Sequence, residues 1–234
     1  MNQLMIAIDG PAGSGKSTIA KQVALKFGYI YIDTGAMYRS ITLKALHTHV
    51  SVTDGQALTK LTEQSQVKLE YDLGNGASKL KVILDGNDVS EEIRSLEVTG
   101  NVSAVAAVAG VREAMVRLQQ LMAAQGGVVM DGRDIGTVVL PKAELKIFLT
   151  ASARERSKRR WLELTAKGTT VSLAELEEQI KQRDYYDSHR EVDPLRQADD
   201  AIFLDTTALS LEQVIAKIVD LALEKGAKLS AWKS

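Results

Sequence analysis

The segment from Gly10 to Ser17 can hold the phosphates of a nucleotide. It satisfies the pattern G-x-x-x-x-G-K-[ST] in full, between an apolar run and a stretch with helical spacing. Glycines let successive backbone N–H groups turn towards a phosphate, and the start of the following helix adds partial positive charge. Lys16 would reach the β- and γ-phosphates, and the Ser17 hydroxyl would bind Mg²⁺. A glycine-rich turn with a chance lysine is the alternative, which the flanking strand and helix disfavour.

Other sequence elements narrow the class of P-loop protein. A switch GTPase would also need D-x-x-G and N-K-x-D elements, and neither string occurs in the chain. A large motor ATPase would need more chain around the core. We therefore expect a small kinase that binds ATP through this loop, at Gly10, Pro11, Ala12, Gly13, Ser14, Gly15, Lys16, Ser17 and Thr18.

Asp131 is a candidate for holding the magnesium ion. It ends a later apolar run at 127–130, which is where such proteins place a carboxylate that holds the metal. Turns also favour Asp after a strand, so the residue alone is ambiguous. Beside a P-loop, we expect Asp131 to bind Mg²⁺ through water, together with Ser17.

Several arginines outside the loop suggest that the acceptor is itself a phosphate. Two phosphate groups need guanidinium donors that converge from several segments. Arg133 lies just past the end of a strand, where open α/β sheets bind ligands, and the spacing of Arg183, Asp187 and Arg190 places them on one helical face. Taken singly, each arginine is more often a solvated surface residue. The further candidates are Arg39, Arg112, Arg156, Arg159 and Arg160.

The pattern of apolar runs predicts an α/β fold with a P-loop core. Such runs occur at 4–8, 29–32, 127–130, 145–149 and 201–204, and helical spacing occurs at 16–26 and between the later runs. Strand, helix and strand in this order imply right-handed crossovers and a parallel sheet. We expect about five parallel strands covered by helices on both faces.

Two stretches depart from this rhythm. Apolar residues alternate with polar ones at 67–73 and 80–84, on either side of a turn at 74–76, which predicts a small antiparallel β-rich insert over 65–95. Residues 155–190 predict a helix-turn-helix with a capping box at Ser172 and Glu175, suited to a mobile lid; a rigid helical hairpin is the alternative. We expect one P-loop kinase domain over 1–234.

Composition limits the other functions. The chain has 234 residues, 45% hydrophobic and 25% charged, with a formal net charge of -1, so we expect no nucleic-acid partner. It has no cysteine, three scattered histidines and no apolar run of membrane-spanning length. We expect a cytoplasmic monomer without a membrane segment.

The chain resembles the bacterial-type cytidylate kinases of the nucleoside monophosphate kinase family. The resemblance rests on residues 8–11 with the P-loop, and on stretches at 33–39, 111–113, 131–139 and 146–149, with Arg183-Asp184, Asp187 and Arg190 following in the family's order. It implies that the β-rich insert at 65–95 binds the nucleoside monophosphate. It implies ATP, Mg²⁺ and CMP or dCMP as partners. Another small P-loop metabolite kinase and a non-catalytic ATP-binding regulator are the alternatives.

The resemblance also implies roles for individual residues. Asp134 and Thr34 would accept from the cytosine amine, and the lid arginines Arg156, Arg159 and Arg160 would close over the ATP phosphates. The implied CMP-binding set is Thr34, Tyr38, Arg39, Arg112, Arg133, Asp134, Arg183, Asp187 and Arg190. The implied catalytic set is Lys16, Arg133, Arg183 and Arg190.

Overall fold

A computed structural model describes residues 3–72, 79–166, 168 and 170–230. The chain divides into two compact units, one formed by Met1–Ile32 and Met122–Ser234 and the other by Asp33–Leu121. We refer to them as the P-loop unit and the middle unit, and describe each by itself. The expected turns at 74–76 and 167–170 lie wholly or partly outside the described residues.

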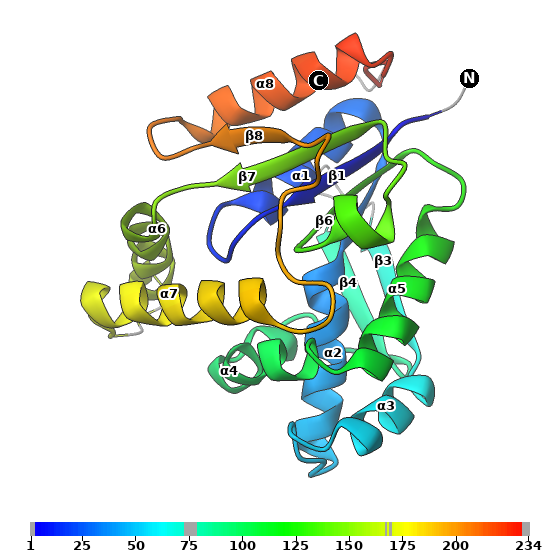
Figure 1. Cartoon of the computed structure of the whole chain (residues 1–234), viewed down its shortest axis with the longest axis vertical. Helices are drawn as coiled ribbons and strands as arrows, with labels where there is room; N and C mark the ends of the chain where they lie inside the picture. The colour runs from blue at the N-terminus through cyan, green and yellow to red at the C-terminus, as the bar shows by residue number, and fades with distance from the viewer. Residues whose placement is uncertain (1–2, 73–78, 167, 169, 231–234) are drawn as a thin grey trace. The chain divides into compact units, whose positions relative to one another are not determined.

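The P-loop unit contains a five-stranded parallel sheet (Figure 1). Its strands are β1 (Met5–Asp9), β2 (Ile30–Asp33), β6 (Val128–Gly132), β7 (Leu145–Thr150) and β8 (Ile202–Asp205). They lie in the order β2-β6-β1-β7-β8, and β1 pairs in parallel with β6 on one side and β7 on the other. The expected fold class, a P-loop core with five parallel strands, is confirmed.

The central position of β1 explains its uniformly apolar sequence. Ile6, Ala7 and Ile8 are fully buried, so both faces of the strand are covered. Helix α1 (Lys16–Phe27) packs on β1, on β6 and on α8 (Leu211–Glu224). The order of the strands reverses around β1, which places the ligand-binding edge of the sheet at its C-terminal end.

Two features follow the ends of β6 and β7. After β6 the chain forms a short π-helical turn, η2 (Ile135–Val139), in which the Leu140 N–H donates to the Ile135 carbonyl at 2.6 Å. After β7 the chain enters α6 (Ala153–Ala166), which packs against α7 (Leu173–His189) (Figure 1). The side chain of Ser172 forms the expected capping box with Glu175 at the start of α7. The motion proposed for this hairpin, and its role as a lid over 155–190, stay predictions.

The middle unit holds the second sheet, with antiparallel strands β3 (Val67–Asp72), β4 (Lys79–Leu84) and β5 (Asn87–Asp88). Val82 is paired with Leu69 and is buried, as the alternation predicts. The helices are α2 (Thr34–His47), α3 (Gly55–Glu63), η1 (Glu92–Arg94), α4 (Leu96–Val105) and α5 (Ala109–Ala123). Helix α2 packs against β4, α3, α4 and η1. The antiparallel sheet expected in 65–95 is present, whereas a separate subdomain with those bounds stays a prediction.

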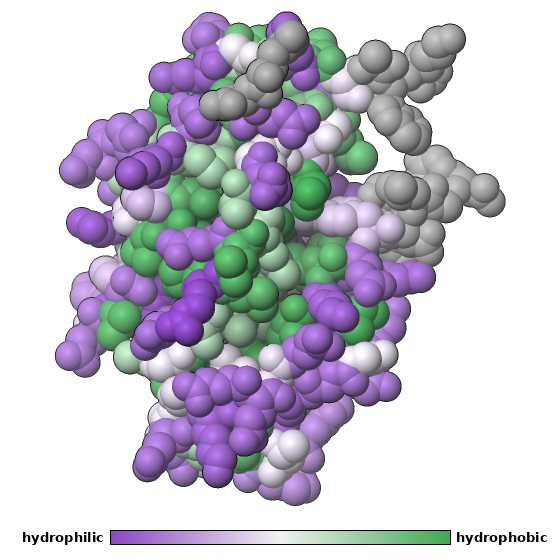
Figure 2. Space-filling view, turned by 90° about the vertical axis from the view of Figure 1, so that its right-hand side faces the viewer, coloured by the Kyte–Doolittle hydropathy of each residue, from purple (hydrophilic) through white to green (hydrophobic). Residues whose placement is uncertain are grey.

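The described residues include no helix long and apolar enough to cross a membrane. Figure 2 shows hydrophobic residues interspersed with hydrophilic ones over one face. Folded proteins normally expose more than half of their surface as apolar atoms, so this mixture alone does not indicate a binding site.

Candidate active site

The P-loop begins where β1 ends, and the neighbouring strand fixes its first residue. Gly10 has φ +150°, and a Cβ atom there would lie 1.9 Å from the Leu149 carbonyl oxygen of β7. A side chain larger than hydrogen therefore cannot fit without moving a backbone of the sheet. This close approach explains why glycine is required at the start of the loop.

Lys16 already lies inside the loop. Its Nζ donates to the Pro11 carbonyl at 2.7 Å and to Ser14 Oγ at 3.3 Å, and the side chain is buried. Burial and the nearby positive charge of Arg133 lower the pKa of Lys16. A bound polyphosphate would supply the negative charge that favours the ammonium form at this position.

The start of α1 presents backbone donors to the loop. Gly15 is the residue before its first turn and has no side chain that could satisfy these N–H groups, whereas α2, α7 and α8 each begin with a side-chain cap. The uncapped N–H groups and the helix dipole favour an anion here. The described geometry therefore fits phosphate binding by Gly10–Ser17.

Ser17 and Asp131 meet, as expected for a shared magnesium site. The Ser17 hydroxyl donates to Asp131 Oδ2 at 2.9 Å, and the Tyr31 hydroxyl of β2 donates to Asp131 Oδ1 at 2.8 Å. Mg²⁺ prefers oxygen ligands and usually retains waters beside substrate phosphates. The Ser17 hydroxyl and the Asp131 carboxylate could supply the protein's oxygen ligands. The described residues form no group of three or more His, Cys, Asp or Glu that could hold the ion alone.

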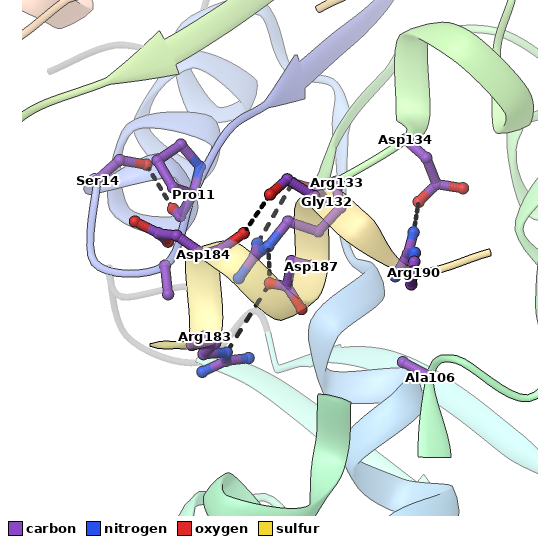
Figure 3. A network of polar contacts seen from close by, with 12 residues as sticks. Pro11, Ser14, Ala106, Gly132, Arg133, Asp134, Arg183, Asp184, Asp187 and Arg190 are labelled. Carbon is purple, nitrogen blue, oxygen red and sulfur yellow. Dashed lines mark hydrogen bonds and ion pairs between the residues drawn. The ribbon is translucent and has the colours of Figure 1, made fainter. Parts of the chain in front are cut away.

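Two of the arginines that are expected to bind the acceptor phosphate lie around one carboxylate (Figure 3). Arg133 Nε donates to Asp187 Oδ2 at 2.8 Å, and Arg183 Nε lies 3.9 Å from the same oxygen. Burial favours the neutral form of Asp187, but the two arginines outweigh it and lower the pKa of Asp187. We call Arg133, Arg183 and Asp187 the arginine cluster.

The arginine cluster holds more positive charge than its carboxylate neutralises. Burial and the like charge of Arg133 lower the pKa of Arg183 to about 10. Arg183 Nε is buried and, within the part of the chain that the structure describes, has no hydrogen-bond partner. A buried guanidinium N–H without a partner is costly, and a phosphate oxygen would satisfy it.

Asp134 and Arg190 form a second pair in the same unit. Arg190 Nη2 lies 3.5 Å from Asp134 Oδ1, and both side chains are buried. Arg190 Nε also donates to the Asp193 carbonyl at 2.7 Å. The structure thus places both residues at the carboxyl end of β6, but their proposed contacts with the cytosine and the phosphate stay predictions.

The three arginines of α6 differ in their surroundings. Arg156 is buried and donates to the Ala12 carbonyl of the P-loop at 2.9 Å and to Asp184 on α7 at 2.6 Å. Arg159 reaches the Ser14 carbonyl at 3.5 Å, whereas Arg160 pairs with Glu163 of its own helix at 3.0 Å. Two of the three expected ATP-binding arginines therefore already touch the loop.

The middle unit carries the other residues of the expected CMP set. Thr34 opens α2 and is buried, as are Tyr38 and Arg112. Arg112 lies over the Tyr38 ring, 5.6 Å from its centroid, and donates to the Ala106 carbonyl at 3.2 Å. Arg39 donates to Thr99 Oγ1 at 2.8 Å, which joins α2 to α4.

Sequence reasoning did not identify three residues that support these groups. Tyr31 orients Asp131, Asp184 holds Arg156, and Asp9 accepts two backbone hydrogen bonds from η2. Asp9 and Asp184 stand inside the stretches that carried the family resemblance, which was the available signal. Tyr31 lies in an apolar run, and its sequence position carries no signal of its contact with Asp131.

A family model and the curated relatives of the chain agree on one family. A family model described as cytidylate kinase matches residues 6–224. The chain is 54% identical to a cytidylate kinase from Bacillus anthracis over 226 residues, 97% of this chain and 99% of that protein. It is 52% identical to one from Desulfitobacterium hafniense over 222 residues, 95% of this chain and 94% of that protein. A solved structure of an uncharacterized protein from Eubacterium ventriosum is 12% identical and has a TM-score of 0.50, and the match covers 95% of this chain and 99% of that one. At this identity the likeness concerns the fold alone.

Proposed function

Since this chain belongs to the cytidylate kinase family, we propose that it transfers the γ-phosphoryl group of ATP to the 5′-phosphate of CMP or dCMP. The products are ADP and CDP or dCDP, so the enzyme is a phosphotransferase with a phosphate group as acceptor. The observation that carries the proposal is the arginine cluster: Arg133 follows Gly132, which pairs with Asp9 beside the P-loop, and the buried Arg183 Nε has no hydrogen-bond partner among the described residues. It supplies positive charge for a second phosphate beside the P-loop.

The chemistry asks for positioning rather than for a protein base. The acceptor phosphate is largely a dianion near neutral pH, since its second pKa is about 6. The protein must hold two charged phosphates in line and neutralise the charge on the transferred group. We propose Lys16, Arg133, Arg183 and Arg190 for this task, and removal of one such donor typically lowers the rate about 10²- to 10³-fold.

A magnesium ion fits the residues at the end of β6. We propose that the Ser17 hydroxyl binds it directly and that Asp131 binds it through water, while Tyr31 keeps the carboxylate in place. When bound, the ion neutralises phosphate charge. The lid arginines Arg156, Arg159 and Arg160 would add to this neutralisation on the ATP side, and a closed lid would exclude water.

Recognition of CMP is proposed to depend on hydrogen-bond acceptors for the cytosine amine. Cytosine offers an exocyclic amine donor, which needs a carboxylate or hydroxyl acceptor such as Asp134 or Thr34. Uracil presents an oxygen at that position, so a site built this way would reject UMP by leaving buried polar groups unpaired. The remaining proposed contacts are Tyr38, Arg39, Arg112, Arg133, Arg183, Asp187 and Arg190.

The proposed enzyme acts in pyrimidine nucleotide metabolism. We further propose a cytoplasmic monomer that binds no nucleic acid, in keeping with the absence of cysteine and the net charge of -1. Size-exclusion chromatography with light scattering would test the oligomeric state.

ADP production with Mg-ATP and separate acceptors tests the function. The panel is CMP, dCMP, UMP, AMP and shikimate, with a reaction without acceptor as the control. We expect turnover with CMP and dCMP well above that with UMP. Turnover only with a non-phosphorylated acceptor would point to another metabolite kinase, and ATP binding without any turnover would point to a regulator.

A further inference from the structure

The geometry points to Asp9 as a positioning residue that holds η2, and with it Arg133 and Asp134, in register with the P-loop. Asp9 is the last residue of β1, and Gly10 follows it directly. This inference rests on the proposed function, because Arg133 and Asp134 are expected to contact CMP.

The Asp9 carboxylate holds the start of η2 with both of its oxygens. Oδ1 accepts from the Ile135 N–H and Oδ2 accepts from the Gly136 N–H, each at 2.7 Å. Asp9 is only 4% exposed. The first N–H groups of a helical turn have no partner within it, and here a carboxylate from a distant strand satisfies two of them. Both buried N–H groups therefore depend on Asp9 for their acceptor.

Lys146 of β7 also packs against η2. A Cβ atom on Gly136 would lie 3.1 Å from Lys146 Cδ and 3.3 Å from Asp9 Oδ2, so the turn packs closely on side chains from both β1 and β7. Lys146 cannot easily withdraw, because its buried Nζ donates to the Pro141 carbonyl at 2.7 Å and to Asp200 at 2.9 Å. The turn therefore has little room to shift towards these two side chains.

This arrangement links two parts of the reaction site. The sheet register pairs Asp9 with Gly132, so the P-loop and the segment with Arg133 and Asp134 leave adjacent strands side by side. The ends of β1 and β6 fix where that segment begins, and the Asp9 carboxylate fixes where it ends. Since a misplacement of about 1 Å can cost about 100-fold in rate, this constraint matters for catalysis.

The Asp9→Asn variant tests the inference. Asparagine keeps the shape, but it offers one acceptor oxygen and turns an NH₂ group towards a backbone N–H. We expect kcat/KM for CMP to fall about tenfold or more, because a buried backbone N–H group is left without its acceptor. The affinity for ATP, measured by calorimetry without CMP, should stay within about twofold of the wild type, since Asp9 makes its two hydrogen bonds to η2 and not to the loop. Amide exchange at Ile135 and Gly136 should become faster.

Two further variants separate positioning from loss of stability. Gly136→Ala disturbs the same contact while keeping the carboxylate, and it should also lower kcat/KM for CMP. Val214→Ala removes buried methyl groups from α8 and serves as the control; it should lower stability without changing either substrate constant.

The outcomes distinguish this inference from the proposed function. Wild-type protein that does not phosphorylate CMP would overturn both. If the wild type phosphorylates CMP and the kcat/KM of Asp9→Asn for CMP is within about twofold of the wild-type value, only the positioning role is overturned. The positioning role would also be overturned if Asp9→Asn lost ATP and CMP affinity equally and its unfolding temperature fell by a matching amount, as a merely structural defect predicts.

Discussion

Replacing Asp187 with asparagine should destabilise the protein, because it removes the negative charge that compensates Arg133 and Arg183 in the arginine cluster. The Asp187 side chain is 6% exposed and accepts from Arg133 Nε at 2.8 Å. Removing one partner of a buried pair costs about 3–5 kcal/mol because the other charge stays buried. Asparagine retains an acceptor oxygen, so we expect the lower end, about 3 kcal/mol at pH 7.

The pH dependence of this loss has a definite sign. The pKa of Asp187 is lowered in the folded protein, from a value of 3.8, despite its burial, since Arg133 and Arg183 favour the carboxylate. Its contribution to stability is therefore present above pH 3.8 and is lost as the pH falls through the lower folded pKa. The difference between wild type and variant should be constant near neutral pH and shrink in acid.

Urea unfolding at several pH values measures both effects. Glu177→Gln is the matched control, because Glu177 forms an ion pair with Lys181 on the same helix, but at the surface, and its loss should change little. Inorganic phosphate should stabilise the Asp187→Asn variant more than the wild type, since it would bind the uncompensated arginines. A loss below about 1 kcal/mol at pH 7, or one that does not change in acid, would refute this account of the cluster.

Four other outcomes can be measured. Burial raises the pKa of Asp9 from 3.8 to about 7, so the folded state retains a proton that the unfolded chain releases. The free energy of unfolding should therefore fall as the pH rises between these two values, by about 4 kcal/mol more for the wild type than for Asp9→Asn. Urea unfolding at several pH values measures this difference. Gly10→Ala should cost about 3 kcal/mol or more and abolish ATP binding, because its Cβ would meet the Leu149 carbonyl at 1.9 Å; normal ATP affinity would contradict this. Arg156→Lys should weaken ATP binding, since a point charge cannot span Ala12 and Asp184 as the guanidinium does; unchanged calorimetric affinity would count against it. Chelation of Mg²⁺ by EDTA should stop ADP formation while the melting temperature stays unchanged; a fall in melting temperature would indicate a structural metal instead.

Features encoded by neighbouring residues could be predicted from the sequence. The P-loop, the apolar strands and the alternation in β3 and β4 are all local patterns, and the structure has each of them. The proximity of Ser17 and Asp131 followed from one rule, that the carboxyl ends of parallel strands meet at one edge of the sheet.

Contacts between distant segments could not be predicted in the same way. Asp9 follows an apolar strand, as many turn residues do, but its carboxylate binds η2, which begins more than a hundred residues later. Arg156 is expected to close over the ATP phosphates with the lid, and its buried contacts with the Ala12 carbonyl and with Asp184 could not be predicted from its spacing. In both cases the neighbours that decide the role come from tertiary packing, which spacing along one helix or strand does not reveal.

The central place of β1 also affects how the chain must fold during synthesis. β1 ends at Asp9, but its two partners begin only at Val128 and Leu145. At roughly 5–20 residues per second, the ribosome makes the whole middle unit before the first partner emerges, a delay of about ten seconds. Through that interval an apolar strand has no sheet to join. A chaperone that covers this apolar strand would therefore protect the nascent chain until β6 and β7 are made.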